Sequence, residues 1–225
     1  DRGAGPAEIL VGRRHGRSKS AAGDYVFAGG KVEADDIPDD VERFCRRLTA
    51  AEASARLGGD LTPRQALGYW VGAIREAFEE VGILLAYDAA GGFVRPAPDN
   101  HERFAAYRRA CQSSNPAFFT MLRAERLTLA TDRLTYFAHW ITPGEQPLRF
   151  DTRFFATEAP PDQTPEVDGH EIVASRWLTT AEAFEALGRK EITLRLPTIK
   201  NLELLQRAGA RTADVLHGLR GLSVP

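Results

Sequence analysis

Hydrophobic and polar positions divide the chain into short strands and longer helical segments. Short apolar runs bounded by turn residues predict strands at residues 8–14, 25–30, 133–143, 152–159 and 171–178. Residues 37–61 are polar and helix-prone, and we expect a helix at 39–48. Residues 99–126 and 197–219 each predict two short helices. Strands mixed with helices favour an α/β/α or α+β sandwich around a mixed β-sheet.

The clearest helical signal covers residues 62–81. Thr62 can act as the N-cap, Pro63 suits the first helical position, and Gln65 completes a capping box. Gly82 then offers a left-handed stop. The apolar residues at helical spacing are Trp70, Ile74, Ala77, Phe78 and Val81.

Two more helix starts show similar capping chemistry. Asp99 is followed three residues later by Glu102, which predicts a helix start in the 99–126 segment. Thr179 and Glu182 have the same spacing and should open a helix at 181–187.

Composition narrows the class of protein. The 225 residues, 43% of them apolar, suit a single domain over residues 1–225 with insertions. The formal net charge of −2 gives no field that would attract nucleic acid or an anionic membrane. We find no run of eighteen apolar residues and no secretory signal in the first twenty. The two cysteines, Cys45 and Cys111, lack CxxC spacing, which argues against a zinc site and favours the cytoplasm.

Three glutamates gather on one side of the predicted helix 62–81. Glu76 and Glu80 are four residues apart, and Glu79 lies three residues after Glu76. A like-charge pair at this spacing costs roughly 0.2–0.5 kcal/mol in an isolated helix, which Arg75 can partly offset by pairing with Glu79. Two interpretations stay open: a solvated charged face, or oxygen ligands for a hard divalent cation such as Mg²⁺ or Mn²⁺.

The surroundings favour the cation. Gly29 and Gly30 end a strand, and tandem glycines let the backbone turn sharply and approach a ligand. Together these features resemble the Nudix hydrolases, whose box reads Gly, five residues, Glu, seven residues, then Arg-Glu-apolar-x-Glu-Glu-x-Gly-apolar. Residues 75–83 match its second half, Gly30 matches its first glycine, and Asp36 stands where the family has Glu.

An insertion interrupts this box. Residues 37–74 stand where the family usually has seven positions, so a helical insertion at about 37–61 splits the box. The peroxisomal-type acyl-coenzyme A diphosphatases carry an insertion at the same place. The segments that resemble this branch are 26–30, 69–86, 139–157 and 171–184. The resemblance implies a Nudix-type α/β/α sandwich with a mixed sheet, a second helical segment at about 99–126 and extra C-terminal helices.

The resemblance also implies an activity and a metal site. The expected reaction is hydrolysis of coenzyme A or acyl-coenzyme A to adenosine 3′,5′-bisphosphate and (acyl-)phosphopantetheine, with Mg²⁺ or Mn²⁺. Glu79 and Glu80 would be the principal metal ligands, and Glu76 would be a further ligand or would orient the attacking water. Gly30 would contribute its backbone carbonyl. Arg75 would hold the glutamates through an ion pair.

A general base is harder to assign. Glu171, Glu166 and Asp168 lie in or beside the loop 160–169, and Glu171 is our first choice. The alternative is that this acidic loop is merely solvated.

Basic residues could bind the substrate phosphates. Arg13, Arg14 and Arg17 precede the tandem glycines, and arginine suits bidentate contacts with phosphate. Gly29 and Arg153, on the expected strand 152–159, complete the predicted substrate-binding set. An ordinary polar loop is the alternative for the arginines. His139 and His170 have no ligand spacing and are assigned no role.

Other functions stay open. A Nudix pyrophosphatase could instead act on ADP-ribose, NADH or a dinucleoside polyphosphate, and a Nudix-like module could bind a nucleotide without cleaving it. The expected partner is a small nucleoside diphosphate derivative, with no nucleic acid and no membrane. We also allow for a homodimer.

Overall fold

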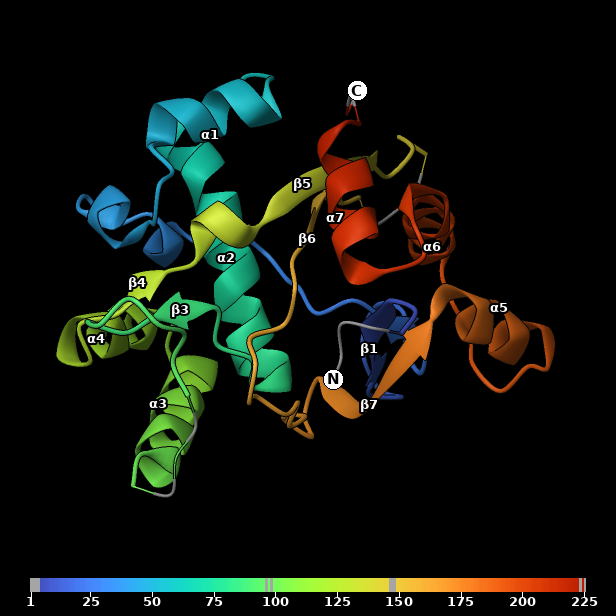
Figure 1. Cartoon of the computed structure of the whole chain (residues 1–225), viewed down its shortest axis with the longest axis horizontal. Helices are drawn as coiled ribbons and strands as arrows, with labels where there is room; N and C mark the ends of the chain where they lie inside the picture. Colours follow the sequence, from blue (N-terminus) through green and yellow to red (C-terminus); the bar gives the residue numbers. More distant parts are fainter. Residues whose placement is uncertain (1–4, 96, 98, 146–148, 223, 225) are drawn as a thin grey trace. The chain divides into compact units, whose positions relative to one another are not determined.

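The computed structural model describes residues 5–95, 97, 99–145, 149–222 and 224 (Figure 1). The strands are β1 Glu8–Arg14, β2 Tyr25–Val26, β3 Ala86–Tyr87, β4 Thr128–Leu129, β5 Thr135–Ile141, β6 Asp151–Ala156 and β7 Ile172–Thr179. The α-helices are α1 Ala50–Leu57, α2 Pro63–Val81, α3 His101–Ser113, α4 Pro116–Ala124, α5 Thr180–Gly188, α6 Leu196–Ala208 and α7 Thr212–Arg220. Short 3-10 turns are η1 Ala34–Asp36, η2 Val41–Phe44 and η3 Thr131–Arg133.

The described residues group into two compact units. The first unit draws on residues 1–27, 135–158 and 169–225, and the second on residues 28–134 and 159–168. The single domain expected over residues 1–225 stays a prediction.

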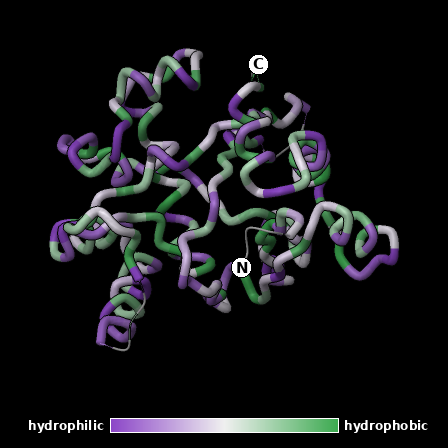
Figure 2. The backbone as a smooth tube through the Cα atoms, in the orientation of Figure 1, coloured by the Kyte–Doolittle hydropathy of each residue, from purple (hydrophilic) through white to green (hydrophobic). Residues whose placement is uncertain are grey.

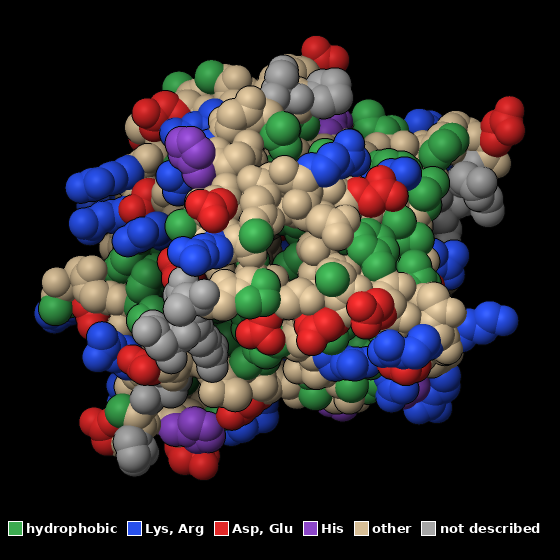
Figure 3. Space-filling view, turned by 45° about the vertical axis from the view of Figure 1, so that its right-hand side comes forward, with side chains coloured by type: hydrophobic (Ala, Val, Ile, Leu, Met, Phe, Trp, Pro, Cys, Tyr) green, Lys and Arg blue, Asp and Glu red, His purple; other side chains and the backbone are tan. Residues whose placement is uncertain are grey.

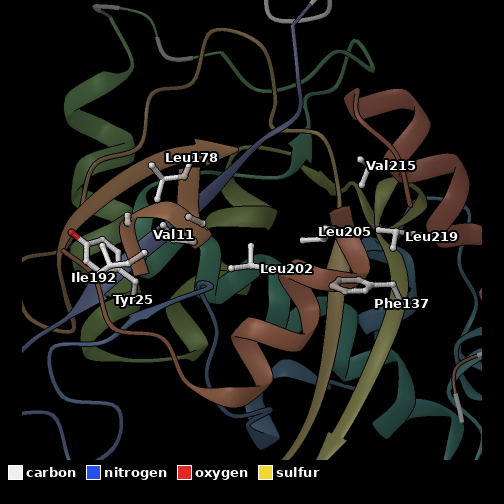
Figure 4. Close-up of a cluster of buried hydrophobic side chains, with 11 residues drawn as sticks. Val11, Tyr25, Phe137, Leu178, Ile192, Leu202, Leu205, Val215 and Leu219 are labelled. Carbon is white, nitrogen blue, oxygen red and sulfur yellow. The ribbon is translucent and has the colours of Figure 1, made fainter. Parts of the chain in front are cut away.

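The first unit holds a three-stranded antiparallel sheet in the order β2-β1-β7 and the antiparallel pair β5-β6. Helices α5, α6 and α7 supply the other side of its core, and α7 packs against β5. Figure 4 shows this core, in which Leu202 and Leu205 of α6 lie between the sheet residue Val11 and Phe137 of β5. The cluster also contains Tyr25, Leu178, Ala183, Ala186, Ile192, Val215 and Leu219.

The second unit is built around α2. The predicted capping box is present, with the Thr62 side chain accepting a hydrogen bond from the Gln65 amide, and Gly82 ends the helix in the left-handed conformation at φ 70°. Helix α1 lies beside α2 (Figure 1). The largest fully buried side chains of this unit are Leu67, Trp70, Val71, Ile74, Phe118, Met121, Leu122 and Leu129. Helix α2 therefore buries a wider apolar face than the predicted stripe.

The prediction of a helix at residues 39–48 is wrong. The chain makes only the 3-10 turn Val41–Phe44, and the helix of the insertion is α1 at Ala50–Leu57, opened by a Thr49–Glu52 capping box. The reason is tertiary. Cys45 forms a parallel bridge with Leu129, and the Arg46 amide donates to the Leu129 carbonyl at 3.0 Å, so this stretch pairs with β4.

Of the two other predicted capping boxes, one is present and one is not. Asp99 does not cap α3, because Asn100 takes the N-cap position and makes no side-chain capping bond. The Thr179–Glu182 capping box opens α5 as predicted. All pairs of named strands are antiparallel within the described residues, and parallel pairing there is confined to the isolated bridges Tyr25–Leu194 and Cys45–Leu129.

The helices alternate hydrophilic and hydrophobic positions along their length (Figure 2). Among the described residues, none of the helices combines the length and apolar character needed to cross a bilayer. The face shown in Figure 3 carries acidic and basic side chains interspersed with apolar ones.

Candidate active site

Two glycines of α2 let the segment after β2 lie against the helix. A Cβ on Gly68 would stand 2.6 Å from Ile37 Cγ2 and 3.0 Å from Val32 Cγ1. A Cβ on Gly72, one turn later, would stand 3.3 Å from Asp36 Oδ2. Real Cβ atoms rarely sit this close to a neighbour, so residues with side chains at these positions would push the segment away. The stripe continues one turn further to Glu76.

This packing reunites the two halves of the split box. A Cβ on Gly30 would overlap the carboxylate of Glu76, so the glycine backbone lies directly against that side chain. The Gly29 amide donates a hydrogen bond to Glu80 Oε2 at 2.9 Å. Both tandem glycines thus touch the acidic side of α2, although 31 inserted residues, by sequence count against the family pattern, separate them from it.

Arg75 holds the acidic side chains together. Its Nε and Nη2 donate to the two oxygens of Asp36 at 2.7 and 3.1 Å. Its Nη1 donates to Glu79 Oε2 at 2.9 Å and lies 2.9 Å from Glu76 Oε1. Its Nη2 also donates to the Lys31 carbonyl at 2.9 Å. One guanidinium therefore links the segment after β2 to two of the three glutamates.

Asp36, for which the sequence predicts no role, positions the guanidinium of Arg75. It is 1% exposed and bonds Arg75 with both oxygens, while its Oδ2 also accepts from the Glu33 amide at 2.8 Å. The signal was present, because Asp36 occupies the place of the family's first glutamate in the box. It fixes the turn η1 to the guanidinium.

We name Asp36, Glu76, Glu79 and Glu80 the carboxylate cluster. Glu80 is only 3% exposed, and the side chains of Glu76 and Glu79 are 14% and 12% exposed, so the solvated-face interpretation is wrong. Burial by itself would lower the pKa of Arg75, but its hydrogen bond and charge pairing with Asp36, helped by Glu76 and Glu79, raise that pKa above its ordinary value. Arg75 therefore stays charged, and its one guanidinium faces three carboxylates, those of Asp36, Glu76 and Glu79.

Such a cluster has the donor chemistry of a magnesium or manganese site. Carboxylate oxygens are what these hard cations prefer, and a cation would offset the excess negative charge. Within the described residues, however, no group of three or more acidic, histidine or cysteine side chains is arranged to hold a metal ion. The described contacts engage Glu76 Oε1, Glu79 Oε2 and Glu80 Oε2, one oxygen of each glutamate. The carboxylate oxygens are the right type of ligand for such a cation. For three of them to bind one ion, the glutamate side chains must change rotamer.

The acidic loop of the second unit is attached to the end of α2. The Glu166 amide donates to the Val81 carbonyl and the Asp168 amide to the Glu80 carbonyl, both at 3.0 Å. Two of the candidate bases thus belong to segments bonded to the carboxylate-bearing helix. Nearby, burial and the charge of Glu79 raise the pKa of the Cys111 thiol to about 12, which disfavours the nucleophilic thiolate.

The other predicted site residues belong to the first unit. Glu171 is exposed, and its Oε2 lies 3.4 Å from Arg14 Nη2. Arg13 pairs with Tyr25 and Ala174 in the sheet and is exposed. The Arg13 side chain is therefore accessible to solvent.

Arg17 lines a hollow of about 360 Å³ in the first unit. The other lining residues are His15, Ser18, Gly169 and His170. The Arg17 amide donates a hydrogen bond to His15 Nδ1 at 3.0 Å, so this ring nitrogen acts as an acceptor. The hollow combines a guanidinium, imidazoles and a hydroxyl, which are groups that hydrogen-bond phosphate. No sequence pattern predicts that His15 and His170 line one hollow, because only the β1–β7 ladder brings their loops together.

Arg153 is held within the β5–β6 pair. Its side chain is 6% exposed, and its Nη1 donates to Asp151 Oδ1 at 2.8 Å. His139 on the neighbouring strand lies 2.5 Å from the same oxygen through its Nε2. Burial would raise the pKa of Asp151, but the hydrogen bond from His139 and the charge of Arg153 lower it below its ordinary value. Arg153 therefore has an internal carboxylate partner.

Comparison with known proteins identifies the family. The family described as the NUDT19 Nudix domain matches residues 46–205, most of the chain. The chain belongs to this family. The matched region contains Glu76, Glu79 and Glu80 of this Nudix chain. Gly30 and Asp36 precede it; Gly30 lies against Glu76, and Asp36 bonds Arg75.

Two curated relatives and one solved structure are similar to the Nudix chain. The acyl-coenzyme A diphosphatase NUDT19 of Gallus gallus is 33% identical over 87% of this chain and 60% of its own length. The protein of the same name from Xenopus laevis is 25% identical over 88% of this chain and 59% of its own length. The chain thus spans about 60% of the length of these relatives.

The solved structure is the crystal structure of a NUDIX hydrolase from Alicyclobacillus acidocaldarius. It matches with a TM-score of 0.69 and 26% identity, covering 93% of this chain and 87% of that one. The expected Nudix-type α/β fold is confirmed.

Proposed function

We propose that this chain is a divalent-metal-dependent Nudix diphosphatase that cleaves the pyrophosphate of coenzyme A or acyl-coenzyme A. The products would be adenosine 3′,5′-bisphosphate and (acyl-)phosphopantetheine. The observation that carries the proposal is the carboxylate cluster, which contacts the tandem glycines despite the insertion. The substrate is supported by two relatives named acyl-coenzyme A diphosphatase.

The glutamates of α2 would hold the cation. Glu79 and Glu80 are the proposed principal ligands, Glu76 is a third ligand or orients the water, and the Gly30 carbonyl completes the set. When bound, Mg²⁺ or Mn²⁺ supplies charge neutralisation at the diphosphate and lowers the pKa of a bound water. Arg75 carries no chemistry itself; it restrains Glu76 and Glu79, which it contacts at 2.9 Å.

Hydrolysis needs an acceptor for the proton of the attacking water. The water oxygen bonds to one phosphorus, the P–O bond to the bridging oxygen breaks, and the bridging oxygen leaves with the other phosphate. Glu171 remains our first proposal for the proton acceptor, because its exposed carboxylate is accessible to water; its Oε2 lies 3.4 Å from Arg14 Nη2. Asp168 and Glu166 are the alternatives, supported by the attachment of their loop to α2.

The substrate phosphates need cationic partners. We propose Arg13, Arg14 and Arg17 for this role, together with the Gly29 backbone and Arg153. The hollow beside Arg17 supports phosphate binding there, because its lining contains no carboxylate. Arg153 would position substrate while Asp151 fixes its guanidinium.

A panel of diphosphates tests the proposal. Coenzyme A, an acyl-coenzyme A, ADP-ribose, NADH and a dinucleoside polyphosphate are each incubated with Mg²⁺ or Mn²⁺, and products are separated by chromatography. We expect adenosine 3′,5′-bisphosphate from the first two and little from the others. Preferential turnover of ADP-ribose or NADH would move the assignment to another Nudix pyrophosphatase. Binding of coenzyme A without product from any compound would favour the non-catalytic module.

Glu79→Gln is the matched test of the metal site. The amide keeps the size of the side chain but removes a charged ligand, so kcat should fall by roughly a hundredfold or more while the circular dichroism spectrum stays unchanged. Glu102→Gln, an exposed change on α3, is the control. Activity near the wild-type level in Glu79→Gln would remove Glu79 from the proposed ligands.

A further inference from the structure

Helix α3 lies outside the box, yet two of its side chains bond the helix that carries the glutamates. Arg108 Nε donates to the Glu79 carbonyl at 3.1 Å, and Gln112 Nε2 donates to the same carbonyl at 2.8 Å. Arg108 Nη2 also donates to the Glu166 carbonyl at 2.6 Å. One guanidinium therefore joins the last turn of α2 to the acidic loop.

With these bonds, each of the last four backbone carbonyls of α2 accepts a hydrogen bond. The last four carbonyls of a helix have no partner within it. The Phe78 carbonyl accepts from Gly82, and the Glu80 and Val81 carbonyls accept from the amides of Asp168 and Glu166. The remaining one, on Glu79, is taken by Arg108 and Gln112. The turn that carries two proposed metal ligands is thus bonded to α3 and the acidic loop.

The charge and shape of this junction also suit Arg108. A cation near a helix C-terminus interacts favourably with the partial negative charge there. Burial lowers the pKa of Arg108, and the charges of Asp168 and Glu166 act in the opposite direction. A Cβ on Gly82 would stand 3.2 Å from Arg108 Nη1 and 3.4 Å from the Glu166 carbonyl oxygen, so the left-handed glycine leaves room for the guanidinium.

We propose that Arg108 is a positioning residue of the active site, fixing the backbone of Glu79 against the loop that carries Glu166 and Asp168. This inference rests on the proposed diphosphatase function. Because Arg108 acts on the metal-ligand turn through the backbone, its loss should weaken metal-dependent turnover. Substrate affinity should change little, since the role assigns Arg108 no contact with substrate.

Arg108→Gln tests the proposal, with Arg109→Gln as the matched control. Arg109 is the next residue on α3 and is exposed, so its variant has the same change in charge and helix composition. We expect Arg108→Gln to lower kcat with coenzyme A by roughly tenfold or more, as for other residues that support metal ligands. The Mn²⁺ concentration for half-maximal activity should rise several-fold, with KM nearly unchanged. Arg109→Gln should match the wild type.

Two further measurements separate positioning from general stability. Amide hydrogen exchange in the peptide 160–168 should accelerate in Arg108→Gln at a temperature where the protein stays folded, because the loop loses its anchor. Arg108→Lys should remain impaired, since an ammonium group lacks the planar fork that reaches two carbonyls. Gln112→Ala should produce a smaller effect in the same direction.

Several results would overturn the inference. One is wild-type kcat and Mn²⁺ dependence in Arg108→Gln; another is an activity loss that follows the folded fraction while loop exchange stays unchanged. If the wild-type chain cleaves no diphosphate, the proposed function fails by itself. The positioning role is then still decided by loop exchange and by the affinity of wild type and variant for Mn²⁺ in calorimetry.

Discussion

Arg75 and Asp36 show how one buried ion pair can organise a whole cluster. Both side chains are almost fully buried, and removing a buried charge from water is costly unless good hydrogen bonds replace the lost hydration. Here the guanidinium makes bonds to two carboxylates and one carbonyl, and Asp36 is held by both Arg75 and an amide. The ion pair therefore serves to hold Glu76 and Glu79 in defined positions.

Asp36→Asn should destabilise the protein moderately. The change weakens charged hydrogen bonds to Arg75, which contribute about 1.5–3 kcal/mol. The loss stays below that of a bare buried charge because Glu76 and Glu79 still neutralise the guanidinium. Urea unfolding followed by circular dichroism measures the effect. Asp35→Asn, at an exposed neighbour, should cost almost nothing, and equal stabilities for the two variants would contradict the structural role of Asp36.

Gly30→Ala should impair catalysis more than folding. The added methyl group would overlap the Glu76 carboxylate, which Arg75 holds in place, so that carboxylate must move. A displacement of about 1 Å at a reacting site can cost roughly a hundredfold in rate. Steady-state kinetics at saturating Mn²⁺ would show this as a lower kcat. Gly144→Ala is the control, since a Cβ there meets nothing within 4 Å; identical kinetics in both variants would place Gly30 outside the site.

At the scale of elements, α2 is at once a core helix and the carrier of the carboxylates. Its apolar face buries large side chains such as Trp70 and Ile74, while its glycine stripe receives the segment after β2. Its last carbonyls are bonded to α3 and the acidic loop. The insertion supports it by packing α1 alongside. Several elements therefore determine where the glutamates lie.

Gly68→Val should test the glycine stripe. Valine has better helix propensity than glycine by a few tenths of a kcal/mol, but forcing atoms into a packed contact costs about 1–3 kcal/mol. We therefore expect net destabilisation, because the new side chain meets Ile37 and Val32. Activity should fall as well, since the segment carries Gly30 toward Glu76. Thermal unfolding and kinetics measure both, and a more stable, fully active variant would show that this contact is dispensable.

At the scale of the whole molecule, the proposed site residues are divided between the two compact units. The carboxylate cluster, Arg75 and the tandem glycines belong to the second unit, and Glu171, Arg153 and the arginines of β1 and its following loop belong to the first. The cytoplasmic location and the homodimer stay predictions. The carboxylate cluster lies wholly within the second unit, so its binding of a cation can be tested on the intact chain.

Mn²⁺ should stabilise the intact protein. A ligand that binds only the folded state adds RT ln(1 + [L]/Kd), about 2.7 kcal/mol at a hundredfold excess over Kd. We expect Tm in differential scanning calorimetry to rise with Mn²⁺ and to return to its original value with EDTA, which should also abolish turnover. In Glu79→Gln the rise should shrink or vanish. An equal rise in that variant would place the bound ion elsewhere.

Local chemistry made much of this structure predictable. Thr62, Gln65 and Gly82 set the ends of α2, and Thr179 set the start of α5, because caps satisfy backbone groups within a few residues of one another. The spacing of Arg75 and the three glutamates likewise placed them on one helix, and the pairing of Arg75 with Glu79 followed from it. These features depend on sequence neighbours alone.

Tertiary structure decided what lies between distant segments. The expected helix at 39–48 gave way to the 3-10 turn Val41–Phe44 and a bridge between Cys45 and Leu129. The glycines of α2 allowed Gly30 to reach Glu76 across the insertion. The bonds from Arg108 to Glu79 and Glu166 had no sequence signal. Periodicity and capping report only interactions within one element, whereas these contacts depend on which backbones can approach closely, and that is fixed only when the chain packs.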